Sequence, residues 1–373
     1  MRERCLYYLF AWLTATLIYA CGKEKSQVSA DNIMGEAELI TITEKNNYDE
    51  IIITNRKGER VAHYILLDKD SISPTGIQED AEIIKVPLTS AILDSEVYAG
   101  AFEELGADKA IRGMFDTDFV TSPTLKKAID DRQIINAGSG STPNLEKIAV
   151  SSPEVVFISY FDGMQTQAID KIGIPVIKMF DLQESTPLGR AEWIRFIGRL
   201  VGKKVQADSI YSEVKKHYLA EKQLSDGANT ISEKKKVLTE TIYEGVWNVA
   251  GGKSYQACLI KDAGGKYFKE ADATQMTLML SPEAVLKDGA DSDVWIIRYY
   301  GNGEELKRIL DSDPIYKEIK ALKDKNVYYS DTSASGLFRE FPFHPEKVLK
   351  DYRIIISGGP EEALTYFKPL FKK

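Results

Sequence analysis

Two hydrophobic patterns follow one another along the chain after residue 36. Short segments that alternate or run apolar between turn-forming residues predict strands at 37–43, 50–54 and 60–67. From Val86 onward, apolar strands alternate with helical patterns. Strands are expected at 109–113, 133–136, 155–159 and 176–179, and helices at 95–105, 143–150 and 162–172. This alternation predicts a parallel sheet with helices packed against it.

A single long helix is expected next, over 187–224. Apolar residues from Trp193 to Tyr218 recur at helical spacing, and no proline follows Pro187 within this span. After a polar break at 226–235, a second series of strands is expected at 236–243, 246–250, 294–299 and 326–329. Its helices are expected at 254–262, 281–289, 303–311 and 345–356. The pattern predicts an α/β fold of two Rossmann-like lobes with mostly parallel sheets, joined by one long bridging helix.

The expected domains follow from these breaks. They are a signal peptide at 1–20, a flexible tether at 21–36, an N-terminal α/β lobe at 37–186, the bridging helix at 187–224 and a C-terminal α/β lobe at 225–373. A chain of this length exceeds a single comfortable core, which also favours two domains.

The N-terminus reads as a secretory signal. Arg2 and Arg4 precede a mostly apolar stretch at 5–20 that is short for a membrane span. The stretch ends in Ile18-Tyr19-Ala20-Cys21, which resembles a bacterial lipobox, in which the cysteine carries the lipid after cleavage. An ordinary signal peptide with an incidental cysteine, or an uncleaved anchor, is the alternative. The polar segment after Cys21 is typical of a tether and favours lipidation.

Charge and cysteine content exclude several classes. The chain holds 48 Lys and Arg against 56 Asp and Glu, a net charge of −8. Without residues 1–20 these become 46 and 55, so the net charge is −9. Scattered acidic charge offers no basic stripe for nucleic acid. With Cys5 removed and Cys21 lipidated, Cys258 has no disulfide partner within the chain. We expect a monomer.

The two halves contain related segments. Residues 143–160 read PNLEKIAVSSPEVVFISY, and residues 281–299 read SPEAVLKDGADSDVWIIRY. Each has proline and glutamate in the opening turn of a helix, an acidic residue before an apolar strand, and a tyrosine at the strand's end. Similar units in two halves predict a binding cleft between two lobes.

Five ordered segments carry a family resemblance: PNLEKI with the strand after it, AEWIRFIGRLVGKKVQAD, WNVAGGKSYQACLIKDAGGKY, SPEAVLKDGADSDVWII and FHPEKVLKDY. Over about 86–367, the chain resembles the substrate-binding proteins that serve ABC importers of iron–siderophore complexes, haem and cobalamin. The resemblance implies two α/β lobes joined by a long helix, a metal chelate, tetrapyrrole or corrinoid ligand, and a dimeric ABC permease with its ATPase subunits as partner. It implies a lipid-anchored protein on the periplasmic side of a bacterial membrane, with display on the outer surface as the alternative.

Glu146 and Glu283 occupy matching first turns of the matching helices. The resemblance implies that one glutamate on each lobe docks against arginine pockets on the permease. The alternative is helix electrostatics, because a carboxylate in a first turn gains roughly 0.3–1 kcal/mol from the helix dipole.

Ligand contacts are expected where strand carboxyl ends meet loops, the usual binding edge of α/β sheets. This rule selects Tyr98, Ser139, Gly140, Tyr160 and Phe161 in the first lobe, and Trp247, Tyr255, Arg298, Tyr299 and Tyr300 in the second. Aromatic side chains suit a flat macrocycle or chelate. Arg298 suits a ligand carboxylate or phosphate, which favours an anionic siderophore. For any single aromatic residue, core packing is an equal alternative.

The sequence gives little support for a metal site, a nucleotide site or a catalytic site. His63, His217 and His344 are far apart and are interpreted as structural, so no directly bound metal is expected. The segment Gly251-Gly252-Lys253-Ser254 lacks the first glycine of a phosphate-binding loop, so no nucleotide cofactor is expected. No catalytic motif is found. An accessory binding lipoprotein without an ABC partner and a tetrapyrrole-processing enzyme of related fold remain the alternatives.

Overall fold

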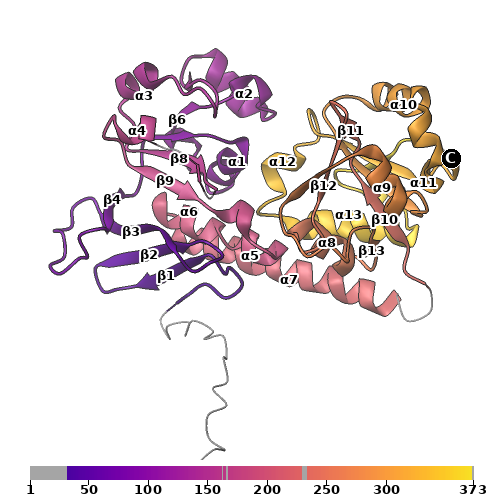
Figure 1. Cartoon of the computed structure of the whole chain (residues 1–373). Coiled ribbons are helices and arrows are strands. Elements are labelled where there is room, and N and C mark those ends of the chain that lie inside the picture. Colours follow the sequence, from indigo (N-terminus) through magenta and orange to yellow (C-terminus); the bar gives the residue numbers. More distant parts are fainter. Residues whose placement is uncertain (1–31, 162, 165–166, 229–232, 372–373) are drawn as a thin grey trace, which may run out of the picture. The chain divides into compact units, whose positions relative to one another are not determined.

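Four sheets and their connecting helices make up the part of the chain that the structure describes (Figure 1). The computed structural model describes residues 32–161, 163–164, 167–228 and 233–371. The expected signal peptide and Cys21 lie outside these residues. Residues 33–373 form one compact unit. Among the described helices, none combines the length and the apolar character that a membrane span needs.

The first lobe holds two sheets. The N-terminal sheet has the order β1-β2-β3-β4, from β1 (Ile40–Glu44), β2 (Tyr48–Thr54), β3 (Arg60–Asp68) and β4 (Glu82–Val86). A parallel sheet of order β7-β6-β5-β8-β9 follows, from β5 (Ala91–Leu93), β6 (Ile111–Met114), β7 (Ile135–Asn136), β8 (Val155–Ser159) and β9 (Val176–Met179). Its connections carry α1 (Glu96–Glu104), α2 (Pro123–Asp130), α3 (Leu145–Ser151) and α4 (Gln167–Asp170).

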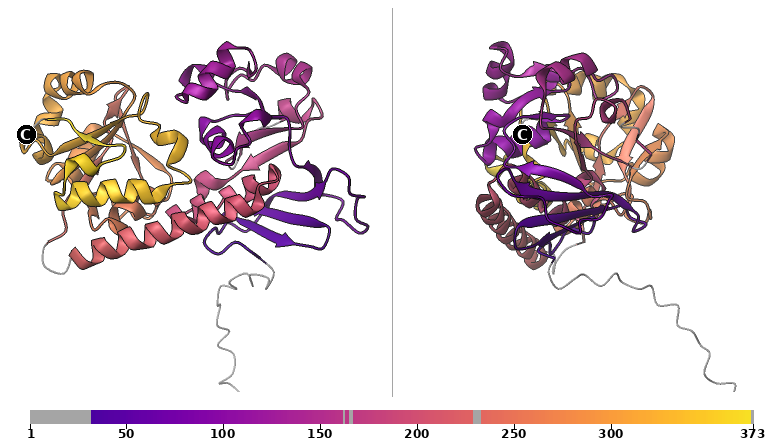
Figure 2. Two further views of the ribbon diagram at one scale, coloured as in Figure 1. Left: turned by 180° about the vertical axis from the view of Figure 1, so that it is seen from behind. Right: turned by 90° about the vertical axis from the view of Figure 1, so that its left-hand side faces the viewer.

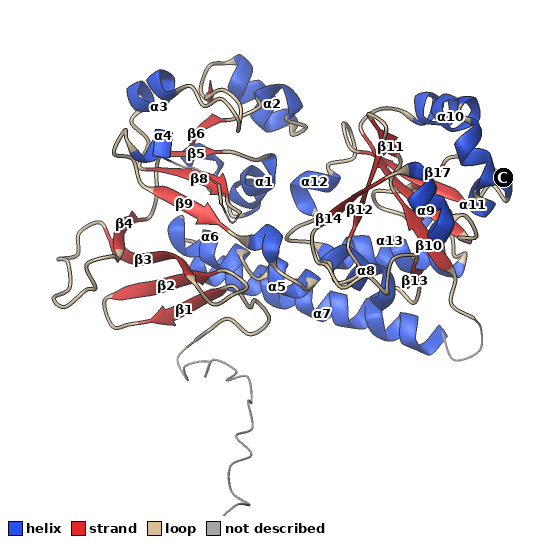
Figure 3. Ribbon diagram, viewed as in Figure 1, coloured by secondary structure: helices blue, strands red, loops and turns tan. Residues whose placement is uncertain are grey.

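The second lobe also holds two sheets (Figure 3). The larger has the order β13-β10-β15-β16-β17 and is parallel except for its last strand, from β10 (Lys236–Thr239), β13 (Lys266–Tyr267), β15 (Val294–Tyr299), β16 (Val327–Asp331) and β17 (Lys368–Pro369). The smaller is antiparallel, from β11 (Ile242–Tyr243), β12 (Val246–Ala250) and β14 (Thr277–Leu280). The helices are α8 (Tyr255–Asp262), α9 (Pro282–Gly289), α10 (Gly303–Ser312), α11 (Lys320–Lys323), α12 (Leu337–Glu340) and α13 (Pro345–Ser357).

This arrangement confirms the predicted fold class of two α/β lobes with mostly parallel sheets and a long helix. The expectation of one continuous helix over 187–224 is wrong in its first half. The segment forms α5 (Pro187–Ala191), α6 (Ile194–Leu200) and α7 (Lys204–Ala228). Gly202 has a φ of +69°, a left-handed conformation that ends α6 and that glycine adopts without strain.

Helix α7 belongs to the cores of both lobes. Ala207, Tyr211 and Val214 pack into the hydrophobic cluster of the first lobe, while Tyr218 packs into that of the second. At 25 residues, the helix is about 38 Å long. It runs along the base of both lobes, as the rear view shows (Figure 2). The prediction of a bridging helix therefore holds for its second half.

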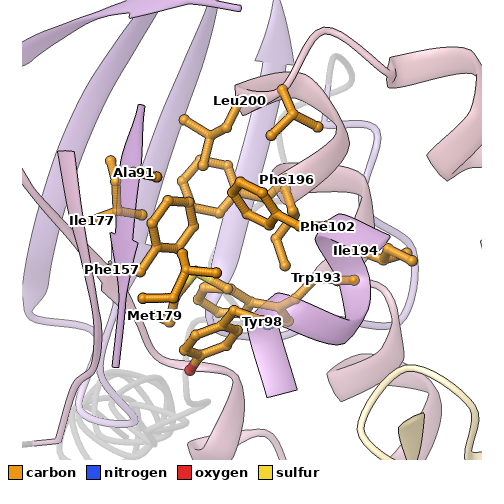
Figure 4. Close-up of a cluster of buried hydrophobic side chains, with 14 of the residues drawn as sticks. Ala91, Tyr98, Phe102, Phe157, Ile177, Met179, Trp193, Ile194, Phe196 and Leu200 are labelled. Carbon is orange, nitrogen blue, oxygen red and sulfur yellow. The ribbon is translucent and has the colours of Figure 1, made fainter. Parts of the chain in front are cut away.

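Aromatic side chains fill the first-lobe core where the parallel sheet meets α1 and α6 (Figure 4). The rings of Phe102 and Phe157 meet edge to face, with centroids 5.5 Å apart. Trp193 and Phe196 meet in the same way at 6.3 Å. Full burial of a large apolar side chain stabilises by roughly 1.5–3 kcal/mol, so this cluster fixes the sheet whose strand ends carry the site.

Candidate ligand-binding cleft

Two adjoining cavities lie between the lobes. Their volumes are about 550 and about 1070 Å³, and residues of both lobes line each one. They share Phe119, Leu182, Tyr255, Arg298 and Tyr300. Ligand pockets typically measure roughly 300–1,000 Å³, so the combined cleft has room for a macrocycle or a metal chelate.

Strand carboxyl ends supply most of the cleft's lining. In the first lobe, Asp94 follows β5, Asp116 follows β6 and Ser159 ends β8. In the second lobe, Glu240 follows β10 and Arg298 lies near the end of β15. Because parallel strands end at the same edge, the sheets bring these distant residues to one side.

A buried polar network forms the floor on the first-lobe side. The Asp181 carboxylate accepts a hydrogen bond from the Tyr98 hydroxyl at 2.9 Å and from Arg190 Nε at 3.0 Å. Arg190 is buried, and its guanidinium lies 5.0 Å from the centre of the Tyr255 ring. Arg190 therefore connects α5 to the second lobe while its charge stays matched by Asp181.

Asp94 is the least compensated carboxyl group of this floor. It accepts hydrogen bonds from the Ser159 backbone N–H at 2.5 Å and from the Ser159 hydroxyl at 3.2 Å. Burial raises the pKa of Asp94 to about 7, against the lowering effect of these hydrogen bonds. The group therefore titrates near neutral pH while lining the cleft.

On the second-lobe side, Arg298 is bound to neighbours within its own lobe. Its Nε donates to Glu240 at 2.7 Å, and its Nη2 donates to the Gln256 side chain at 3.0 Å. Glu240 thus neutralises the guanidinium within the protein, and it raises the pKa of Arg298 further although burial lowers it. We expected Arg298 to be available to pair with a ligand anion. In the structure, its guanidinium is already paired within the protein.

Exposed apolar side chains concentrate on the cleft walls. Of fifteen large hydrophobic residues that are exposed among the described ones, eight line the cleft. They are Phe119, Phe161, Leu182, Tyr243, Met276, Tyr300, Ile309 and Phe338. The Phe119 and Tyr300 rings meet across the two lobes with centroids 5.8 Å apart. Such a concentration of apolar surface marks a binding site rather than chance exposure.

Seven of the ten residues selected from the sequence as ligand contacts line the cleft: Tyr98, Tyr160, Phe161, Tyr255, Arg298, Tyr299 and Tyr300. Tyr98 is only 1% exposed and contributes to the floor rather than to a wall. Whether each of these side chains touches a ligand stays a prediction.

The structure contradicts the selection of Trp247. Its side chain is fully buried, its indole N–H donates to the Thr239 carbonyl at 3.0 Å, and its ring packs against Trp295 and Tyr316. Strand β12 alternates its side chains between two faces, and Trp247 points to the core. It is a core residue.

Ser139 and Gly140 do not line the cleft cavities. They follow β7, which is the edge strand of its sheet. The Ser139 hydroxyl is bonded to Thr142 Oγ1 at 2.8 Å, and the Gly140 N–H donates to Asp116 at 3.2 Å. Of the two, Gly140 therefore contacts a lining residue of the cleft, and Ser139 bonds only within its own loop.

Several lining residues were missed in the sequence. Phe119 and Leu182 lie in segments that follow β6 and β9, so the strand-end rule, applied further along these loops, would have found them. Met276 precedes β14, and Phe338 lies in α12. No local sequence pattern marks either position as part of the cleft, because only tertiary packing brings it there.

Glu146 and Glu283 are both exposed in the first turns of α3 and α9. The capping residues Asn144 and Ser281 accept hydrogen bonds from the Lys147 and Ala284 N–H groups. The backbone N–H groups at the start of α9 and the Ser281 hydroxyl lower the pKa of Glu283. Both carboxylates are thus solvent-accessible, as docking requires, and docking itself stays a prediction.

Among the described residues, no group of three or more His, Cys, Asp or Glu side chains is placed to hold a metal ion. His63 Nε2 is 3.0 Å from Glu50 in the N-terminal sheet. His344 contacts Glu104 and Glu346 at 2.9 Å each. These contacts are structural in character.

A separate groove of about 780 Å³ lies over the start of α7. Its lining includes Lys203, Lys204, Glu213 and His217, and no aromatic side chain apart from histidine. Val205, Ile210 and Val214 also line this groove, but it lies away from the carboxyl ends of the parallel strands, so the cleft between the lobes is the better candidate for a ligand site.

Comparison with known proteins agrees with this geometry. A family model described as periplasmic binding protein matches residues 97–334. The chain therefore belongs to the family of periplasmic binding proteins.

One relative in sequence is an uncharacterized lipoprotein of Methanocaldococcus jannaschii, 26% identical over 281 residues, which are 71% of this chain and 66% of the relative. The match thus spans slightly less than two thirds of that protein.

Two solved structures illustrate the likeness of fold. The triscatecholate siderophore-binding protein of Bacillus subtilis, in complex with ferri-bacillibactin, has a TM-score of 0.58 and 20% identity, and the match covers 74% of this chain and 95% of that one. The periplasmic heme-binding protein of Roseiflexus sp. has a TM-score of 0.57 and 18% identity, covering 72% and 98%. At this identity, the likeness concerns the fold alone.

Proposed function

We propose that the chain is the lipid-anchored, extracytoplasmic substrate-binding component of an ABC importer. It captures an iron chelate, haem or cobalamin in the cleft between its lobes and delivers it to a permease. The observation that carries this proposal is the gathering of eight exposed apolar side chains on the walls of one cleft. A flat, partly apolar ligand would cover this surface on binding.

Membership of the periplasmic binding protein family supports a solute-binding role rather than catalysis. The lipoprotein relative supports the lipid anchor expected at Cys21. Solved neighbours that bind a siderophore or haem support a metal chelate or tetrapyrrole as ligand.

Ligand binding tests the proposal. The purified protein is mixed with ferric siderophores, haemin and cyanocobalamin, and ligand that remains with the protein is measured by absorbance after ultrafiltration. We expect submicromolar binding of one class, weakened at least about tenfold by Phe119→Ala combined with Tyr300→Ala. Leu219→Ala, which removes an exposed apolar residue of α7 outside the cleft, is the matched control. Binding that survives the double substitution would place the ligand elsewhere.

Docking is tested separately. Charge reversal by Glu146→Lys and Glu283→Lys leaves the cleft intact, so ligand affinity should stay within about twofold while ligand-dependent stimulation of the permease–ATPase complex is lost. Glu79→Lys serves as a charge-matched control, at an exposed position between β3 and β4. An accessory binder without an ABC partner would show no difference among the three variants.

A further inference from the structure

The ionisable groups of the cleft show which ligands suit it. Five acidic residues line the two cavities: Asp94, Glu96, Asp116, Glu184 and Glu240. Three basic residues line them: Arg190, Arg298 and Arg339. The lining therefore has an acidic excess.

Each of the three arginines is already paired with a carboxylate of the protein. Arg190 binds Asp181 at 3.0 Å and Arg298 binds Glu240 through its Nε at 2.7 Å. Arg339 Nη2 lies 3.2 Å from Glu340. A ligand anion would have to compete with these partners, and displacement from Arg190 or Arg298 would leave Asp181 or Glu240 largely buried without a counter-charge.

Three of the lining carboxylates, in contrast, accept hydrogen bonds from neutral donors only. Asp94 is bonded by Ser159, Glu96 by the N–H groups of Thr121 and Ser122 at 2.7 Å each, and Asp116 by Gly140. None of the three contacts a lysine or arginine within the part of the chain that the structure describes. Their oxygens keep capacity to accept hydrogen bonds from a ligand.

From this arrangement we infer that the cleft selects a chelate or macrocycle of zero or positive net charge that offers hydrogen-bond donors, and disfavours strongly anionic ligands. This inference rests on the proposed function. Aromatic and aliphatic walls supply affinity through burial of apolar surface. The carboxylates of Glu96 and Asp116 repel anions and, together with Asp94, accept hydrogen bonds from donors such as amide N–H groups or an ammonium.

Four coloured probes with different charges test the inference. Cyanocobalamin is an uncharged, amide-rich corrinoid, and a ferric trihydroxamate with an ammonium tail is cationic. Haemin carries two propionates, and a ferric triscatecholate is a strong anion. We expect an uncharged or cationic probe to bind at least about tenfold more tightly than either anionic probe, measured by ultrafiltration at fixed ionic strength.

Two charge variants test whether the acidic lining itself disfavours anionic ligands. Asp116→Asn removes one acidic group of the lining, and we expect it to raise the affinity for the ferric triscatecholate about threefold. Asp118→Asn removes an exposed charge from the same loop but outside the cleft lining, and should leave that affinity unchanged.

The possible outcomes separate the two hypotheses. Tighter binding of haemin or of the triscatecholate than of both other probes, weakened by Phe119→Ala, overturns the charge inference and leaves the proposed function standing. Binding of none of the four probes overturns both.

Discussion

Trp247 and Phe338 show how the two environments of an aromatic residue differ in the second lobe. Trp247 is fully buried against Trp295, whereas Phe338 is 45% exposed and lines the cleft. Both are large and apolar, and both could be interpreted as ligand contacts or as core. What separates them is the direction in which β12 and α12 point their side chains, and this depends on tertiary packing.

Trp247→Ala should therefore reduce stability rather than affect only ligand binding. It removes a fully buried indole and leaves the Thr239 carbonyl without its donor, so we expect a loss of roughly 3–5 kcal/mol in the free energy of unfolding. Urea denaturation followed by circular dichroism measures it. Tyr300→Ala, at an exposed position, should change stability by less than about 0.5 kcal/mol. Equal effects of the two substitutions would contradict this assignment.

Asp94 should make stability depend on pH. Its pKa is about 7 in the folded protein and about 3.9 in the unfolded chain, so the folded state retains a proton that the unfolded state loses. Stability therefore falls as pH rises from about 4 to about 7 and stays lowered above that. Asp94→Asn removes this cost.

We expect Asp94→Asn to be more stable than the wild type by roughly 1–3 kcal/mol at about pH 8, with the difference vanishing near pH 4. Urea denaturation at both pH values provides the measurement, with Asp118→Asn as control. A difference that does not change with pH would mean that the Asp94 carboxyl group titrates normally.

The strand-end rule predicted the cleft's position and most of its aromatic lining because parallel sheets bring their carboxyl ends together regardless of side-chain detail. It failed for Ser139 and Gly140, since β7 is an edge strand away from the cleft, and the sequence does not reveal strand order. It also could not show that Arg298 is neutralised, because Glu240 is 58 residues away along the chain.

At the scale of elements, most strands and helices followed from their periodicity. The strands at 155–159 and 176–179 were predicted at the bounds that β8 and β9 have. Short edge elements such as β13 and β17 were missed, because two residues carry no periodic signal. The predicted helix over 187–224 was joined across two breaks, at 192–193 and at 201–203, and the apolar periodicity continues through both.

At Gly198, α6 packs closely against Ala207 of α7. A Cβ atom placed there would lie 2.3 Å from the Ala207 Cβ and 3.1 Å from the Lys203 carbonyl oxygen. Alanine normally stabilises a helix by about 1 kcal/mol relative to glycine. Here we expect Gly198→Ala to lower the free energy of unfolding by roughly 1–3 kcal/mol, because the two helices must separate.

Thermal and urea unfolding check this expectation. Gly140→Ala is the control, since a Cβ atom there would meet only Asp116 at 3.9 Å. A gain in stability for Gly198→Ala would show that α6 and α7 are not in contact at this point.

At the scale of the whole molecule, His344 connects the two lobes. Its Nε2 lies 2.9 Å from Glu104 at the end of α1, and its Nδ1 lies 2.9 Å from Glu346 in α13. These two carboxylates raise the pKa of His344 to about 9, although burial lowers it. The resulting stabilisation is complete below the ordinary histidine pKa of about 6.5 and is lost as pH rises through about 9.

His344→Gln should accordingly be less stable than the wild type by roughly 1–2 kcal/mol at about pH 6, and equally stable at about pH 10. Denaturation curves at the two pH values test this. His217→Gln, on an exposed face of α7, should differ from the wild type by less than about 0.5 kcal/mol at either pH. A pH-independent loss in His344→Gln would indicate lost packing instead of lost charge.

If the chain serves an importer as proposed, helix α7 also bears on how the transporter distinguishes a ligand-loaded binding protein from an empty one. Because its side chains pack into the hydrophobic cores of both lobes, we expect ligand binding in the cleft to change the separation of the lobes only slightly. Cargo-free molecules would then present nearly the same face to the transporter as loaded ones and compete for it. In a cell with abundant carrier and scarce cargo, uptake would slow as more carrier is made.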